Sequence, residues 1–108
     1  MHVITVEFVA NTEDAEAVRA AYQPIIDAYS SHEACLGVQL VQNKSRRQRN
    51  RFMFMNFWRT REEAMEISSR PEVNAAHDKI YAVSSDGQNL NAWEPISQRG
   101  IVAVDGAS

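Results

Sequence analysis

Residues 52–64 read FMFMNFWRTREEA, and within them a strand pattern gives way to a helix pattern. Residues 52–58 are rich in aromatic side chains and contain no Gly or Pro, which favours a strand whose side chains point alternately to opposite faces of a sheet. Thr60 and Glu63 then form a capping box, in which a hydroxyl and a carboxylate satisfy free backbone N–H groups at a helix start. We therefore expect a strand that leads directly into a short helix.

The remaining elements follow from hydrophobic periodicity. Apolar residues alternate with polar ones at 3–10 and 36–41, as in half-buried strands, and recur every three or four positions at 15–29, as on one face of a helix. Residues 69–72 (SRPE) repeat the capping pattern and predict a further helix up to residue 81, and a last strand is expected within 93–104. The order β-α-β-β-α-β predicts an α+β, ferredoxin-like (split βαβ) domain with a four-stranded antiparallel sheet.

Length and composition argue against several classes of function. The chain has 108 residues, enough for a single domain, which we expect at 1–104 with a short flexible tail at 105–108. Its formal net charge of −3 argues against nucleic-acid binding, and its apolar runs are too short to span a membrane. Cys35 is the single cysteine, so no intrachain disulfide can form, and a reducing, cytoplasmic location is expected.

The predicted sheet should have one uncovered face, because its helices occupy the other. We expect that uncovered face to carry Thr5, Glu7, Gln39, Asn56 and Trp58. Large apolar side chains on such a face favour covering by a small-molecule ligand, a second copy of the chain, or both. A homodimer is therefore expected.

Three segments of the chain resemble the antibiotic biosynthesis monooxygenase family. They are 33–40 (EACLGVQL), 51–64 (RFMFMNFWRTREEA) and 71–77 (PEVNAAH), and the likeness extends from about residue 3 to residue 81. The resemblance implies a dimeric α/β barrel, in which each subunit's sheet packs on that of its mate, and a pocket between sheet and helices. The family includes cofactor-independent oxygenases of phenolic and quinol-like substrates, and a haem-degrading branch.

The two branches imply different site residues. The haem-degrading branch has an Asn on the first strand, a Trp on the second helical segment and a His near its end, and the matching positions here are Glu7, Ile67 and His77. Only His77, the axial iron ligand in that branch, is kept, which argues against haem degradation. The oxygenase branch has a Trp at the end of the third strand, here Trp58, and a pocket Asn at the position of Phe54. Asn56 points the same way as Phe54 and is a candidate substitute.

Two residues are candidate general bases. Glu7 has apolar neighbours on a strand face that is expected to be covered, and partial burial would make its carboxylate a stronger base. His77 shares the inward helix face of Val73 and Ile80. Each also has a structural interpretation, an ion pair between subunits for Glu7 and a buried, hydrogen-bonded histidine for His77. Glu7 is the preferred base, with His77 kept as the alternative.

The predicted function is oxidation of an aromatic, quinol or polyketide-like small molecule by dioxygen, without metal, flavin or haem. Asn56 is expected to orient a substrate oxygen, and Phe54 and Trp58 to stack on the substrate ring. The full set of candidate substrate-binding residues is Thr5, Gln39, Phe54, Asn56, Trp58 and Tyr81. No His, Cys or carboxylate spacing indicates a metal site. The alternatives are a non-catalytic small-molecule-binding dimer and a haem-binding protein that uses His77.

Overall fold

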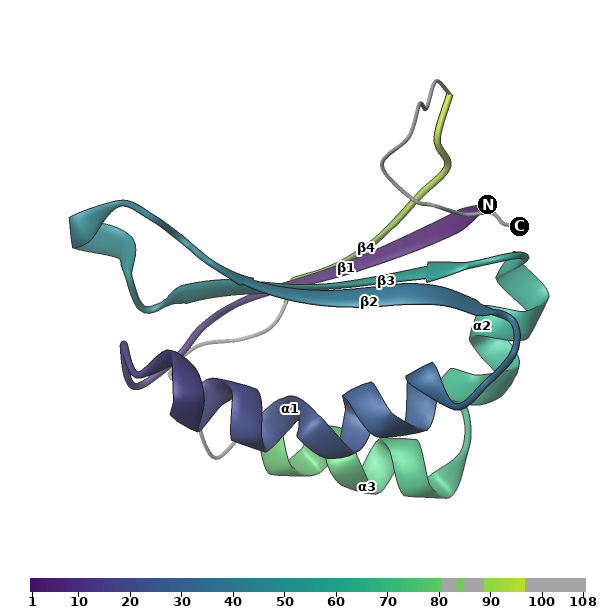
Figure 1. The fold of residues 1–108 in the computed structure, drawn as a ribbon, viewed down its shortest axis with the longest axis horizontal. Coiled ribbons are helices and arrows are strands. Elements are labelled where there is room, and N and C mark those ends of the chain that lie inside the picture. Colours follow the sequence, from purple (N-terminus) through teal and green to yellow (C-terminus); the bar gives the residue numbers. More distant parts are fainter. Residues whose placement is uncertain (81–83, 85–88, 97–108) are drawn as a thin grey trace.

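The structure, a computed structural model, describes residues 1–80, 84 and 89–96. Its elements are, in chain order, β1 (His2–Val9), α1 (Ala15–Ser30), β2 (Cys35–Gln42), η1 (Arg46–Gln48), β3 (Arg51–Trp58), α2 (Arg61–Ser68), α3 (Pro71–Ile80) and β4 (Asn89–Trp93). The strands form one sheet, and α1, α2 and α3 lie on the same side of it (Figure 1). The predicted β-α-β-β-α-β order is confirmed, with the second helical region divided into α2 and α3.

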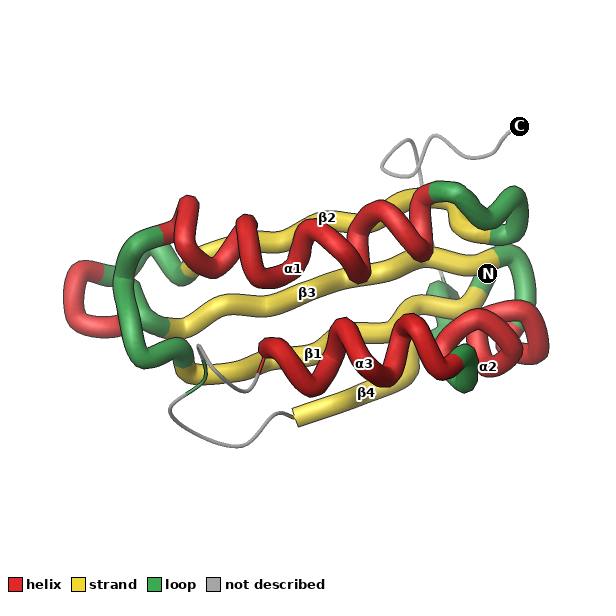
Figure 2. Tube along the Cα trace, turned by 90° about the horizontal axis from the view of Figure 1, so that it is seen from below, coloured by secondary structure: helices red, strands yellow, loops and turns green. Residues whose placement is uncertain are grey.

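The sheet is antiparallel throughout, in the order β2-β3-β1-β4. Figure 2 shows α1 lying along β2 and β3, and α3 lying along β1 and β4. This two-layer arrangement is the ferredoxin-like fold that the element order predicts. The two central strands, β3 and β1, therefore lie beneath the layer of helices.

Side chains cap the first turns of α1 and α2. The Asp14 carboxylate Oδ1 accepts hydrogen bonds from the backbone N–H of Glu16, at 3.0 Å, and of Ala17, at 3.4 Å. Thr60 Oγ1 accepts one from the backbone N–H of Glu63, at 3.2 Å. Such caps stabilise a helix by about 1 kcal/mol because they satisfy N–H groups that have no intrahelical partner. Pro71 opens α3, where its missing N–H costs nothing, so the predicted break between the two helices is confirmed.

The side chains of β3 point to the opposite faces of the sheet from those expected. Residues opposite each other on paired strands share a face, and the register pairs Ile4 with Asn56 and Val6 with Phe54. Ile4 and Val6 pack in the core beneath the helices, so the helix-facing side of β3 is Phe52, Phe54, Asn56 and Trp58, all at most 4% exposed. The expectation that Asn56 and Trp58 share the uncovered face with Thr5, Glu7 and Gln39 is therefore wrong. The uncovered face of β3 instead carries Met53, Met55 and Phe57.

Aromatic rings in contact with one another fill the core between α1 and the sheet. Tyr22 of α1 lies between Phe8 and Phe54, with ring centroids 5.4 and 4.9 Å away, and the ring of Tyr29 meets Trp58 edge-on at 5.2 Å. Rings of this size contribute strongly to core stability through buried area and quadrupole contacts. Trp58 is therefore a core residue in the single chain, without any partner subunit.

The last strand that the structure describes lies earlier in the chain than the strand expected within 93–104, and most of that range lies outside the described residues. β4 is Asn89–Trp93, whereas the sequence pattern placed a strand within 93–104. Trp93 Nε1 donates a hydrogen bond to Thr5 Oγ1 at 2.8 Å, which ties β4 to β1 through side chains as well as backbone. Tyr81 and residues 97–108 lie outside the described residues, so the domain bounds 1–104, the tail 105–108 and the role of Tyr81 stay predictions. Among the helices that the structure describes, none is long and apolar enough to cross a membrane.

Candidate functional site

A cavity of about 460 Å³ lies between the helix-facing side of the sheet and the helices. Strands β1, β3 and β4 form one wall, and α1, α2 and α3 form the other. Its lining residues are His2, Ile4, Val6, Tyr29, Phe54, Asn56, Arg61, Met65, Ser68, Asn74, His77, Leu90 and Ala92. The volume falls within the roughly 300–1,000 Å³ of small-molecule sites, and an apolar lining with a few polar groups is typical of them.

The cavity brings together three of the predicted site residues, Phe54, Asn56 and His77. Trp58 belongs to the same side of the sheet but is fully buried and does not line the cavity. Thr5, Glu7 and Gln39 lie on the opposite face, since they pair with or flank Met53 and Met55. Glu7 is exposed there, so the sheet stands between the two candidate bases.

His77 is the titratable side chain of α3 that reaches the cavity. Burial lowers its pKa from the ordinary 6.5, an effect that the neighbouring Asp78 carboxylate partly opposes. Its Nε2 lies 3.4 Å from the hydroxyl of Tyr29, whose pKa burial raises to about 12. Near neutral pH, Tyr29 therefore keeps its proton and His77 is mostly the neutral imidazole, a form that can accept one.

Asn56 is held in place by the indole of Trp58. Trp58 Nε1 donates a hydrogen bond of 2.6 Å to Asn56 Oδ1, and both side chains are buried. Because the amide oxygen is engaged by the indole, the group that Asn56 presents to the cavity is its NH₂, a hydrogen-bond donor. An oxygen atom of a bound molecule is a suitable acceptor for it.

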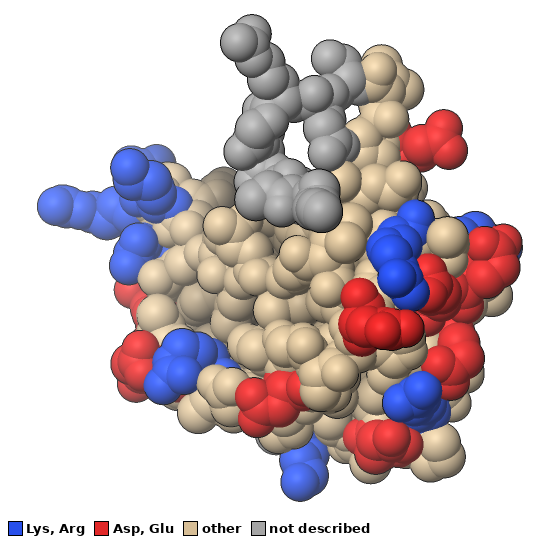
Figure 3. All heavy atoms as spheres, turned by 45° about the vertical axis from the view of Figure 1, so that its right-hand side comes forward, with Lys and Arg blue, Asp and Glu red and all other residues tan. Residues whose placement is uncertain are grey.

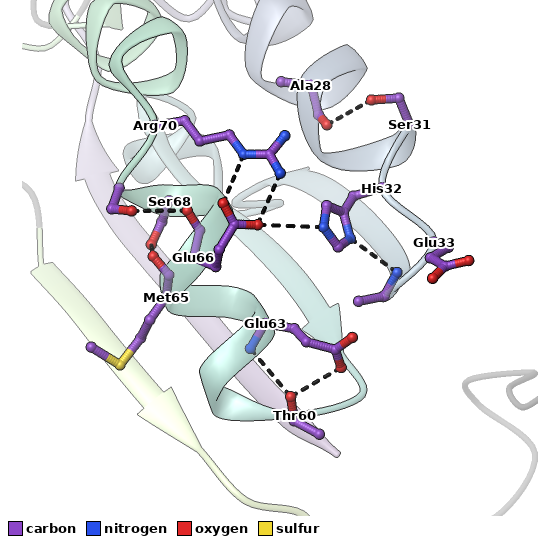
Figure 4. A network of polar contacts seen from close by, with 12 residues as sticks. Ala28, Ser31, His32, Glu33, Thr60, Glu63, Met65, Glu66, Ser68 and Arg70 are labelled. Carbon is purple, nitrogen blue, oxygen red and sulfur yellow. Dashed lines mark hydrogen bonds and ion pairs between the residues drawn. The ribbon is translucent and has the colours of Figure 1, made fainter.

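A network of polar contacts fixes α2, which carries three of the lining residues, to the loop between α1 and β2. The Glu66 carboxylate accepts two hydrogen bonds from the Arg70 guanidinium, at 3.0 and 2.9 Å, and lies 3.6 Å from His32 Nε2 (Figure 4). The Arg70 contacts hold the pKa of Glu66 below its usual value. Figure 4 also shows the Met65 side chain pointing toward β4, across the cavity. The network therefore positions the α2 wall of the cavity.

The comparisons with known proteins agree with this architecture. The model of the family described as antibiotic biosynthesis monooxygenase matches residues 1–79. The chain belongs to this family. No curated protein matches its sequence at a significant level.

Several solved structures share the fold at low sequence identity. SnoaB, a cofactor-independent oxygenase from Streptomyces nogalater, superposes with a TM-score of 0.77 at 8% identity, over 90% of this chain and 94% of that one. A provisionally assigned antibiotic biosynthesis monooxygenase from Deinococcus radiodurans has a TM-score of 0.76 at 19% identity, over 95% of this chain and 100% of that one. Rv0793 from Mycobacterium tuberculosis reaches 0.74 at 13% identity, over 92% and 98%. At these identities the likeness establishes the fold alone.

The residues at the positions of the family's haem-degrading triad do not form a haem site in this member of the family. His77 lines the cavity, but Ile67 is 2% exposed within the core, and Glu7 projects from the opposite face of the sheet. Two of the three positions thus lie outside the cavity. Among the described residues, no group of three or more His, Cys, Asp or Glu side chains is arranged to hold a metal ion.

Several lining residues were missed from the sequence. Arg61, Met65 and Ser68 follow the i, i+4, i+7 spacing of one helix face, a signal that could have found them together. Leu90 and Ala92 of β4 were not predicted, because the sequence pattern indicated a last strand within 93–104. No local sequence pattern shows that α2 and β4 line the same cavity, because only the folded chain brings them opposite each other.

Proposed function

We propose that this protein is a cofactor-independent monooxygenase, which oxidises an aromatic, quinol or polyketide-like small molecule with dioxygen in the cavity between the sheet and the helices. Family membership supports the reaction class, and SnoaB, which has the same fold, is described as a cofactor-independent oxygenase. The observation that carries the proposal is that one largely apolar cavity presents both a neutral imidazole, His77, and an amide donor, Asn56.

His77 is the base in this proposal, in place of Glu7. A phenol or enol bound in the cavity lies on the same side of the sheet as His77, whereas the Glu7 carboxylate lies on the other. The lowered pKa of His77 keeps it unprotonated near pH 7 and ready to take the substrate proton. The Tyr29 hydroxyl beside Nε2 helps to orient the ring.

The protein's part in the reaction is proton removal, orientation and exclusion of water. Deprotonation yields an electron-rich anion that transfers electrons to dioxygen, and a carbon–oxygen bond forms when the two recombine. For a ring methylene, one oxygen atom remains as the new carbonyl and the other leaves as water, so the substrate supplies all four electrons. Asn56 donates a hydrogen bond to the substrate oxygen on which negative charge develops, and Phe54 contacts the ring.

We also propose that the working form is a homodimer. The uncovered face of the sheet carries Met53, Met55 and Phe57, each only partly buried in the single chain, beside Val9 and Val41. A second copy of this face would remove that apolar surface from water, at roughly 25 cal/mol for each Å² buried. Thr5, Glu7 and Gln39 then become interface residues, consistent with the ion-pair interpretation of Glu7.

Oxygen uptake tests the proposed activity. The purified protein, dialysed against a chelator, is mixed with a panel of hydroquinones and polycyclic phenols under isotopically labelled dioxygen. We expect uptake above the rate of autoxidation and one labelled oxygen atom in each product, with no stimulation by added metal, flavin or haem. Saturable binding of the same compounds without any oxygen uptake would contradict the proposal and favour a non-catalytic binding protein.

A further inference from the structure

The charges around the cavity are opposite in sign to those of the chain. The whole sequence has 14 acidic and 11 basic residues, a formal net charge of −3. Of the described residues that line the cavity, none is Asp or Glu, and the ionisable ones are Arg61, His2, His77 and the weakly acidic Tyr29. A ligand in this cavity therefore meets one permanent positive charge and no carboxylate from the described lining.

The geometry of α2 turns Arg61 toward the cavity and its acidic neighbours away. Arg61 lines the cavity with Met65, one turn further along, while Glu63 and Glu66 occupy the other side of the helix. Glu63 is engaged by Arg59 at 2.6 Å, and Glu66 by Arg70 at 2.9 Å. Glu63 and Glu66 are thus already paired with other cations, and Glu62, the third acid of α2, does not line the cavity.

Arg61 itself takes part in none of the ion pairs recorded among the described residues. Its position also does little for helix stability, because a cation in the first turn is opposed by the positive end of the helix dipole. At the right-hand side of the view in Figure 3, Lys and Arg side chains alternate with Asp and Glu. An arginine without an acidic partner at the edge of an apolar cavity is suited to bind an anion.

Arg61 and His2 belong to the same end of the cavity. His2 pairs with Trp58 in the sheet, and Arg61 follows Trp58 by three residues, whereas Val6, Phe54 and Leu90 lie further along the strands. The lining is thus basic toward one end and apolar toward the other. A planar apolar body with an anionic group at one end has the complementary pattern.

We propose that the ligand of this cavity carries a carboxylate beyond its aromatic ring, and that Arg61 is the residue that selects for it. This inference rests on the proposed function for the identity of the site, and it adds the substrate class. The guanidinium presents a planar pair of N–H donors that matches a carboxylate in two parallel hydrogen bonds. Aromatic acids are thereby preferred over neutral aromatics of the same shape.

Binding of a matched pair of probes, 2-naphthoate and 2-naphthamide, tests the inference by calorimetry. The two have the same rings and nearly the same shape and differ in charge. Measurements are made near pH 8, where an ordinary imidazole is largely neutral, so that Arg61 is the cation under test. We expect wild-type protein to bind 2-naphthoate more tightly, with a preference that decreases as salt is added.

Substitution of Arg61 tests whether this residue causes the preference for the anionic probe. Arg61→Gln is expected to weaken the binding of 2-naphthoate about three- to tenfold, as for loss of a partly exposed charged hydrogen bond. The affinity for 2-naphthamide should not change. Arg61→Lys keeps the charge and part of the preference. Arg47→Gln is the matched control, because Arg47 is exposed in η1 and does not line the cavity. All three variants should melt within a few degrees of wild type.

Several outcomes would overturn the inference, and none of them depends on turnover. They are wild-type protein that binds the two probes equally or binds neither, and an Arg61→Gln variant that weakens both probes alike or keeps the preference. The proposed oxygenase activity can be disproved independently of the charge preference. A charge preference that depends on Arg61, with no oxygen uptake on hydroquinones that carry a carboxylate, would uphold the selection and contradict the reaction.

Discussion

Trp58 links the core to the cavity through a single hydrogen bond. Its indole is completely buried and donates to Asn56 Oδ1 at 2.6 Å, so the same side chain packs the core and orients the amide. Truncation of a buried Trp costs about 3–5 kcal/mol, and it would also leave the buried Asn56 oxygen without its donor. Trp58→Ala is therefore expected to lower the free energy of unfolding by about that amount, measured by urea denaturation. A variant that unfolds at the wild-type urea concentration while ligand binding is lost would contradict the core assignment.

The pKa of His77 gives a prediction about the pH dependence of stability. Burial lowers this pKa below the ordinary 6.5, so between the two values the unfolded chain binds more protons than the folded one. The contribution of a neutral His77 to stability is complete above about pH 6.5 and is lost as the pH falls through this range. His77→Gln, which does not titrate, should lose less stability than wild type between about pH 7.5 and pH 5.5. Parallel losses in urea titrations of the two proteins would contradict the burial of His77.

The assignment of residues to sheet faces was limited by composition. Period-two alternation correctly grouped Phe54, Asn56 and Trp58 on one face of β3. It could not tell which face turned toward the helices, because Met53, Met55 and Phe57 on the other side are nearly as apolar. Pairing with β1 decides the matter, and that is a long-range contact that no local pattern contains.

Among the elements, the capped helix starts are the easiest to predict from the sequence and β4 is the hardest. Thr60 gives a strong local signal, so the start of α2 was predicted correctly. β4 consists of NLNAW, in which Asn disfavours a strand and only Leu90 and Ala92 show alternation. Its stability comes from pairing with β1 and from the bond between Trp93 and Thr5, neither of which is visible locally.

The contacts that anchor α2 give a prediction at this scale. Glu66→Gln removes the charge that pairs with Arg70 and His32, and it keeps the shape of the side chain. Because the Glu66 carboxylate is exposed, we expect a small decrease in the urea midpoint, well below that of Trp58→Ala. This decrease should become smaller still in 1 M salt. Asp27→Asn, an exposed change on α1 outside the network, is the matched control. A midpoint difference as large in high salt as in low salt would contradict an electrostatic anchor.

At the scale of the whole molecule, the sheet face turned away from the helices is the one that no described helix covers. Met55 lies at the middle of this face, paired with Thr5 on one side and Gln39 on the other. A lysine there would place a charge in the proposed dimer interface without disturbing the core. Wild type is expected to sediment at twice the chain mass of 12.2 kDa at micromolar concentration, and Met55→Lys at the chain mass.

A substitution elsewhere on the surface controls for charge. Figure 3 shows a group of Lys and Arg side chains projecting at the upper left, at the end of the molecule opposite the charge-alternating one. Arg47 of η1 is exposed, and Arg47→Glu should leave the dimer intact. A wild-type protein that sediments only at the chain mass would contradict the dimer.

The proposed reaction takes place on the helix side of the sheet, and two isosteric variants test this placement directly. His77→Gln removes the proposed base from the cavity, and Glu7→Gln removes the acid from the opposite face. The measurement is kcat for oxygen uptake on a hydroquinone that wild type oxidises, with ligand affinity and sedimentation recorded for both variants. We expect His77→Gln to lower kcat about 10²–10⁴-fold with affinity nearly unchanged, and Glu7→Gln to retain the wild-type kcat. Full activity in His77→Gln, or loss of activity in Glu7→Gln while it remains a folded dimer, would show that the reaction does not take place on the helix side of the sheet.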